Sequence, residues 1–251
     1  MRVGLIAIVA LLTAVSHPAA GQSPSFQNIV GAEVQQALRN PLAEPGVVGV
    51  SSGAALAAAT AIAFGVSVLG AWTIPVFAFV GGLVTTLLVY AMSRDGGRTE
   101  VVTLVLTGIA VNAVASAGMA FVMFVADTQA REQIVFWTLG SLNGTRWLYV
   151  ALAAPLCVIG CVGTLLLARQ LDLLALGDRA ARHVGVDVER LRMIAIVLVA
   201  ILTAAAVSFC GIIGFVGLVV PHLIRILLGP AHRQLVLASA LGGAVLLVAA
   251  D

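Results

Sequence analysis

From Met193 to Phe209 the chain reads MIAIVLVAILTAAAVSF, a stretch without a charged side chain. Arg190 and Arg192 stand directly before it. As an α-helix, a run of this length crosses most of the ~30 Å hydrocarbon core of a bilayer. The stretch therefore predicts a membrane-spanning helix that begins at an arginine-rich boundary.

Further apolar runs repeat this pattern along the chain. They are Val47–Leu69, Thr73–Met92, Val101–Ala126, Trp147–Ala168, Ile212–Leu228 and Leu235–Ala250. The whole chain is 61% hydrophobic and only 10% charged, whereas a soluble domain needs a more polar surface. The sequence predicts an all-α, polytopic bundle of transmembrane helices whose main surroundings are lipid.

The arginines predict the orientation of this bundle. All thirteen basic residues are arginine, and those in the connections fall mainly in alternate loops. The richer set is Arg39, Arg94, Arg98, Arg169, Arg179, Arg182, Arg190, Arg192, Arg225 and Arg233. The opposite side receives Arg131 and Arg146. Positive charge favours cytoplasmic loops, so the richer set is expected in the cytoplasm. A net charge of only +2 gives no indication of a nucleic-acid partner.

Five spans with the clearest apolar runs contain no ionised side chain: Val47–Leu69, Thr73–Met92, Val101–Ala126, Trp147–Ala168 and Met193–Phe209. Their most polar central groups are Thr103, Thr107, Asn112 and Ser116. Ion-coupled carriers usually hold carboxylates or histidines inside the membrane. If the protein moves a substrate, we therefore expect a partner to supply the energy. The sequence has no phosphate-binding loop of the GxxxxGK[ST] type, so ATP hydrolysis would belong to that partner.

The only long cytoplasmic connection is 170–192. Asp178 and Asp187 are predicted to cap two short helices, and Gly185 to end the first of them. Short helices with an apolar and a charged side can dock into the groove of a partner protein. The alternative is an amphipathic loop that lies on lipid headgroups.

Three smaller features have alternative interpretations. Gly49-Val50-Ser51-Ser52-Gly53 fits the G-x-S-x-G nucleophile pattern and keeps an intramembrane serine hydrolase as an alternative, although the serines fit helix capping and close packing better. His222 could touch haem iron, but a role at a helix break beside Pro221 is favoured. The three cysteines lie in apolar runs, so no metal site and no resident cofactor are predicted.

The two ends differ from the rest of the chain. Residues 1–29 combine a short apolar run with a polar stretch, which fits a signal peptide or a partial first helix. Residues 30–251 are predicted to form one transmembrane domain. Asp251 follows an apolar run directly, so a truncated, inactive paralogue of a transporter is a further hypothesis.

Several longer motifs resemble one known family. They are RNPLAEPG from Arg39, VGVSSGAA from Val48, LTGIAVN from Leu106, FWTLGSLNG from Phe136, LLALG from Leu173 with AARHVG from Ala180, and GIIGFVGLVVPH from Gly211. Between Val30 and Asp251 the chain resembles the FecCD-type permease subunits of type II ABC importers, which carry iron–siderophore complexes, haem or vitamin B12. The match is most similar to haem permeases.

The resemblance implies a multi-pass permease of the bacterial inner membrane, with ten helices of which this chain holds about seven to eight. It implies a homodimer with the pathway at its interface, an ABC ATPase subunit on the cytoplasmic loop, and a periplasmic substrate-binding protein. The ATPase-coupling residues would be Leu174, Leu176, Gly177, Ala180, Ala181, Arg182, His183, Val184 and Gly185. Thr99 would form the gate, and Thr107, Asn112 and Ser116 would line the pathway. Arg131 and Arg146 would receive the binding protein.

Overall fold

The computed structural model describes residues 45–95, 98–142 and 147–250, and it divides the chain into two compact units. The α3–α6 unit comprises Pro45–Ser141 with Thr203–Ile213. Within the described residues, the second unit, called the elbow unit below, comprises Leu142–Leu202 and Gly214–Asp251. The boundary predicted at residue 29 lies outside the described part and stays a prediction.

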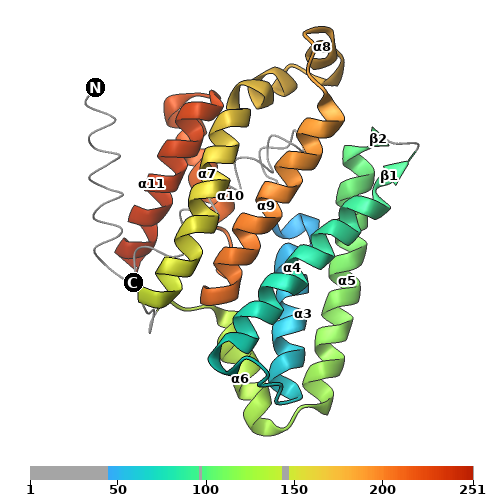
Figure 1. Cartoon of the computed structure of the whole chain (residues 1–251), viewed down its shortest axis with the longest axis vertical. Coiled ribbons are helices and arrows are strands. Elements are labelled where there is room, and N and C mark those ends of the chain that lie inside the picture. The colour runs from blue at the N-terminus through green and yellow to red at the C-terminus, as the bar shows by residue number, and fades with distance from the viewer. Residues whose placement is uncertain (1–44, 96–97, 143–146, 251) are drawn as a thin grey trace. The chain divides into compact units, whose positions relative to one another are not determined.

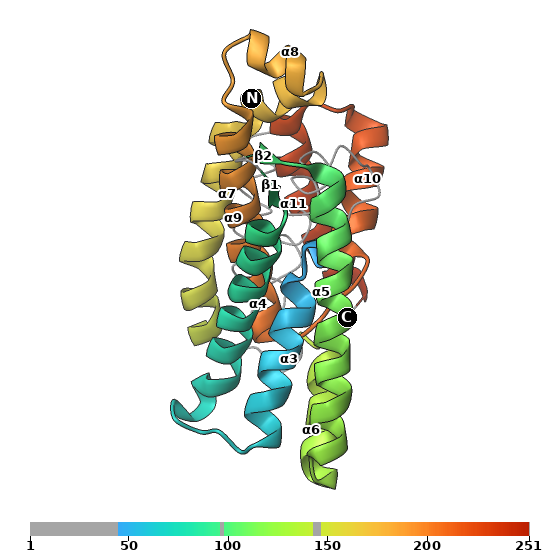
Figure 2. The same cartoon turned by 90° about the vertical axis from the view of Figure 1, so that its right-hand side faces the viewer.

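In the α3–α6 unit, α3 lies between α4 and α5 (Figures 1 and 2). The elements are the 3-10 turns η1 (Pro45–Val48) and η2 (Gly70–Trp72), the helices α3 (Val50–Ala63), α4 (Thr73–Met92), α5 (Val101–Val125) and α6 (Thr128–Leu139), and the strands β1 (Arg94–Asp95) and β2 (Arg98–Thr99). The two strands form a short antiparallel hairpin between α4 and α5. The hairpin and α6 stand at opposite ends of this unit, because α5 separates them along its whole length (Figure 2).

Small residues let α3 and α4 approach closely. A Cβ atom on Gly53 would lie 2.7 Å from the carbonyl oxygen of Gly81, and one on Gly81 would lie 2.6 Å from that of Gly53. The two backbones are therefore in direct contact. This is how membrane helices gain packing energy without a hydrophobic drive between them. Farther along α3, Ala59 and Ile62 pack with Val122, Ala126 and Ile134 of the α5–α6 end.

The elbow unit contains α7 (Trp147–Ala175), α8 (Asp178–His183), the first part of α9 (Val188–Cys210), α10 (Val216–Leu228) and α11 (His232–Ala250). The short α8 joins the end of α7 to the start of α9 (Figure 1). Gly160 and Gly163 of α7 face Leu202 and Leu198 of α9, so these two helices also meet through small residues.

Among the residues that the structure describes, four stretches are long and apolar enough to cross a membrane: Gly70–Met92, Val101–Val125, Trp147–Ala175 and Val188–Cys210. The prediction of an all-α, multi-pass membrane bundle is confirmed. The predicted span Val47–Leu69 was too long, because α3 has only 14 residues and is followed by turns at Gly65 and Gly70 with positive φ. The span predicted from Ile212 begins as a helix only at Val216. The short α6 had no counterpart among the predicted spans.

Candidate functional site

The connection 170–192, called the elbow below, consists of the end of α7, α8 and the first turn of α9. A six-residue helix such as α8 is not stable alone, because helix nucleation is costly. Here a buried cluster holds it in place. Its members are Leu171, Leu174, Ala181, Val188, Leu191 and Ala195. The elbow therefore has an apolar core of its own.

Local capping fixes the two ends of α8. Gly177, with φ 112°, is the N-cap residue, so the prediction that Asp178 caps α8 was wrong. Gly185 ends the helix as predicted, because its positive φ of 89° lets its N–H donate to the carbonyl of Arg182 at 3.0 Å. The predicted cap at Asp187 is confirmed, since its Oδ1 accepts from the backbone N–H of Arg190 at 3.1 Å.

Asp178 forms an ion pair instead of the predicted helix cap. Its carboxylate accepts from Nη2 of Arg192 at 3.2 Å, and the Arg192 side chain is only 1% exposed. Glu189 lies 3.8 Å from Nη1 of the same guanidinium and 3.4 Å from Nη2 of Arg182. A buried arginine needs such partners, because an uncompensated buried charge is costly. The ion pairs tie α8 to α9.

The predicted coupling residues divide into a buried and an exposed set. Leu174 and Ala181 are fully buried in the elbow core, whereas Leu176 is 72% and Val184 66% exposed. Arg182, His183 and Gly185 are exposed as well, and Gly177 and Ala180 are half-buried. The exposed set leaves apolar and basic side chains together on the outer surface of the elbow.

A polar pair fastens the elbow to α11. Asp172 Oδ1 lies 3.0 Å from Nδ1 of His232 and accepts from the backbone N–H of His232 at 3.0 Å. The imidazole is almost fully buried. The end of α7 is thus held by α8 and α9 through Leu171 and Leu174, and by α11 through Asp172.

We expect Asp172→Ala to lower the free energy of unfolding by about 1–3 kcal/mol, because it leaves a backbone N–H and a buried imidazole without their acceptor. Thermal unfolding of the detergent-solubilised protein measures this. Glu132→Ala is the control, since Glu132 is exposed on α6. Equal melting temperatures for the two variants would show that the pair does not fasten α7 to α11.

The predicted pathway residues lie on α5, and two of them, Asn112 and Ser116, line one cavity. A pocket of about 410 Å³ is lined by Gly46, Ser51, Ser52, Ala55, Asn112, Ala115, Ser116, Met119, Thr138 and Ile212. Asn112 spans its wall, since its Nδ2 donates to the Gly46 carbonyl at 3.0 Å and its Oδ1 accepts from the Ser52 hydroxyl at 2.5 Å. The lining is uncharged and rich in hydroxyl groups. This site is called the hydroxyl pocket below.

The other predicted residues lie elsewhere in the α3–α6 unit. Thr107 is half-buried on α5 and is not part of the hydroxyl pocket. Thr99 is buried in β2 of the hairpin. Arg131 is exposed at the start of α6, where its Nε donates to the Ala126 carbonyl at 2.8 Å. Arg146 lies outside the described residues.

The surroundings of Ser51 and Ser52 do not favour nucleophilic catalysis. A 3-10 turn precedes the serines where a nucleophile elbow needs a strand, and Gly49, rather than a serine, is the N-cap of α3. The partner of Ser52 is an amide, and the residues that line the hydroxyl pocket include no histidine or carboxylate. The serines neither cap α3 nor meet a general base, so they serve as pocket lining.

Sequence reasoning missed two features of these sites. The sequence does not indicate that Ser52 contacts Asn112, because only the fold brings these two residues together across 60 positions. The Asp172–His232 pair was missed for the same reason. The polar residues in otherwise apolar helices were the only available signal.

Apolar spans, glycine-mediated helix contacts and a compact elbow with its own core define a multi-pass helical membrane protein. The family is shown by comparison, because residues 28–251 match the model of the FecCD transport family. The chain belongs to this family.

Two relatives and one solved structure illustrate the similarity. The chain is 42% identical over 224 residues to the cobalamin import system permease protein BtuC of Halobacterium salinarum, covering 89% of this chain and 60% of that protein. It is 42% identical over 226 residues to the hemin transport system permease protein HmuU of Yersinia pestis, covering 89% and 67%. A solved structure, described as an inward-facing conformation of a metal-chelate type ABC transporter, matches with a TM-score of 0.84 and 30% identity. That match covers 96% of this chain and 76% of the other.

Proposed function

We propose that the chain is a permease subunit of a type II ABC importer of the bacterial inner membrane, where it moves haem or a ferric siderophore inward. The structure of the elbow is the observation that supports this proposal most directly. The elbow is a compact element with its own hydrophobic core, at the arginine-rich end of two spans. Leu176 and Val184 are exposed on its surface. Exposed apolar anchors on a rigid element are the usual energetic centre of a protein–protein contact.

An ABC ATPase subunit is the proposed partner of the elbow. The buried residues Leu174 and Ala181 hold the element together, and the exposed residues Leu176, Arg182 and Val184 contact the ATPase. The Arg192–Asp178 pair ties α8 to α9, and the Asp172–His232 pair ties the end of α7 to α11, so these pairs would transmit force from the elbow into α9 and α11. The chain itself does not hydrolyse ATP in this proposal.

The hydroxyl pocket is the proposed part of the substrate pathway within the α3–α6 unit. Its small, uncharged side chains, with Asn112 and Ser116 among them, suit a bulky ligand that passes without tight binding. Thr107 lies one helical turn or more from Asn112 toward the hairpin, and Thr99 in the hairpin is the proposed gate residue. The ligand would move along α5.

Two further partners are part of this proposal. A periplasmic substrate-binding protein would dock at the α6 end, where the guanidinium of Arg131 is exposed and held by the Ala126 carbonyl. A second copy of the chain would complete the pathway as a homodimer. Large apolar side chains of α5, such as Val114, Phe121 and Phe124, are exposed and available to lipid or to this second copy.

The test is uptake in a bacterial strain that lacks its own haem permease but keeps a matching ATPase and binding protein. The proposal expects the chain to restore accumulation of haem or of a ferric siderophore, measured with labelled iron. Uptake of cobalamin alone would move the assignment to vitamin B12. No uptake of any of the three, from a folded and membrane-inserted chain, would contradict the permease function.

A further inference from the structure

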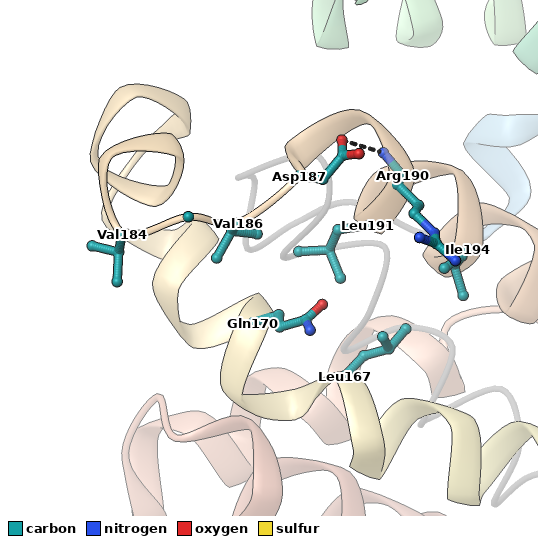
Figure 3. A pocket seen from close by; sticks show the side chains of 9 residues that line it. Leu167, Gln170, Val184, Val186, Asp187, Arg190, Leu191 and Ile194 are labelled. Atoms are coloured by element: carbon teal, nitrogen blue, oxygen red, sulfur yellow. Dashed lines mark hydrogen bonds between the residues drawn. The ribbon is translucent and has the colours of Figure 1, made fainter.

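A second cavity lies beneath the elbow, between the end of α7 and the start of α9 (Figure 3). Its volume is about 440 Å³, within the range of sites for small ligands. It is lined by Leu167, Gln170, Val184, Gly185, Val186, Asp187, Arg190, Leu191 and Ile194. All of these residues belong to the elbow unit, and none of them lines the hydroxyl pocket.

The cavity has an apolar and a polar part. Leu167 and Ile194 form its apolar wall, and the side chains of Gln170, Asp187 and Arg190 supply polar groups beside them (Figure 3). Leu166 precedes Leu167 on α7, and Met193 precedes Ile194 on α9. Both are exposed apolar side chains. The two helices beside the cavity, both long and apolar enough to cross a membrane, therefore also present exposed apolar side chains next to its wall.

Arg190 differs from Arg182 and Arg192 in the partners of its side chain. Arg182 and Arg192 have carboxylate partners within the elbow. Within the described part of the chain, the structure gives the Arg190 side chain no such partner, and the Asp187 carboxylate accepts from the Arg190 backbone N–H instead. An exposed guanidinium at the mouth of a half-apolar cavity is suited to a phosphate group, which it can bind with two parallel hydrogen bonds.

The position of the cavity identifies the source of that phosphate. The arginine bias puts this end of α7 and α9 at the cytoplasmic face, and the cytoplasmic leaflet carries the anionic lipids of the membrane. We propose that the cavity binds an anionic phospholipid, with its phosphate on Arg190 and its glycerol and upper acyl region against Leu167 and Ile194. This lipid would brace the elbow from the membrane side.

The test is native mass spectrometry of the purified chain, released from nanodiscs that contain phosphatidylglycerol and phosphatidylethanolamine. R190Q should retain about fivefold less phosphatidylglycerol, since a single arginine near an anionic surface contributes an effect of this size. R179Q is the matched control, because Arg179 is exposed on α8 and does not line the cavity. It should retain as much as the unaltered chain.

Q170W is a second variant that fills the cavity with an indole ring and keeps every arginine. It should also lower the retained phosphatidylglycerol, and the melting temperature shows that it is folded. Equal retention in R190Q and R179Q would overturn the proposal, and so would equal retention of both lipids by the unaltered chain. An R190Q chain that keeps its lipid but loses the ATPase would show that the cavity is a protein-docking surface.

Discussion

Leu176→Asp is expected to weaken binding of the ATPase subunit by about thirtyfold or more, and to abolish uptake with it. Truncation or charging of a central apolar anchor typically costs at least about 2 kcal/mol of binding free energy. Leu176 is 72% exposed, so the substitution should leave the stability of the permease within about 0.5 kcal/mol. A binding titration in nanodiscs with labelled ATPase measures the change.

Two comparison variants show whether this result reflects docking or loss of folding. Arg179→Ala alters an exposed position of the same elbow and should bind the ATPase almost as well as the unaltered chain. Leu174→Ala removes a fully buried side chain of the elbow core and should lower the melting temperature, because large-to-small core changes cost about 2–5 kcal/mol. If Leu176→Asp bound as tightly as Arg179→Ala, the exposed face of the elbow would not be the docking surface.

Gly53→Leu should prevent correct folding of the α3–α6 unit. A Cβ atom at this position would already meet the Gly81 carbonyl oxygen at 2.7 Å and the side chain of Thr85, so α3 and α4 would have to separate. Overpacking of a close contact typically costs about 1–3 kcal/mol, and more when the backbone must move. Ser52, the next residue, would then lose its contact with Asn112.

The melting temperature in detergent and the yield of monodisperse protein report this loss. Gly214→Ala is the control, because a Cβ atom there would meet nothing within 4 Å and the residue does not have a positive φ. Normal yield and stability for Gly53→Leu would contradict the close packing of α3 and α4.

The sequence predicted the parts of the fold that depend on local composition. Charge-free runs and their arginine flanks located the long helices, and the rules for caps and glycine identified the ends of α8 and α9 at Gly185 and Asp187. The same rules misplaced Asp178, since its carboxylate is drawn to a buried arginine 14 residues later instead of the nearby backbone. Leaving a buried guanidinium without a partner costs more free energy than losing a helix cap, so the ion pair decides where the Asp178 carboxylate lies.

Contacts between distant residues could not be predicted. Hydrophobicity alone extended the first span to Leu69, although positive φ angles at Gly65 and Gly70 turn the chain after Ala63. Asn112 was identified as a polar group within a span, but its partners Gly46 and Ser52 lie 66 and 60 residues away. Composition shows that such a group needs partners, and only the packing of α3 against α5 supplies them.

The elbow brings these observations together. Its core, its ion pairs and the Asp172–His232 contact make it a rigid element that joins α7, α8, α9 and α11. The five spans Val47–Leu69, Thr73–Met92, Val101–Ala126, Trp147–Ala168 and Met193–Phe209 contain no charged side chain that could couple to an ion gradient, and the hydroxyl pocket is uncharged as well. In this account, the work of transport enters through the elbow and from a separate ATPase.

The most direct test is uptake into proteoliposomes that contain the permease, its ATPase and its binding protein. The account predicts that labelled haem or ferric siderophore accumulates only while ATP is hydrolysed, and that ADP or Leu176→Asp reduces accumulation to background. Accumulation in vesicles without nucleotide, driven by a proton or sodium gradient alone, would contradict it.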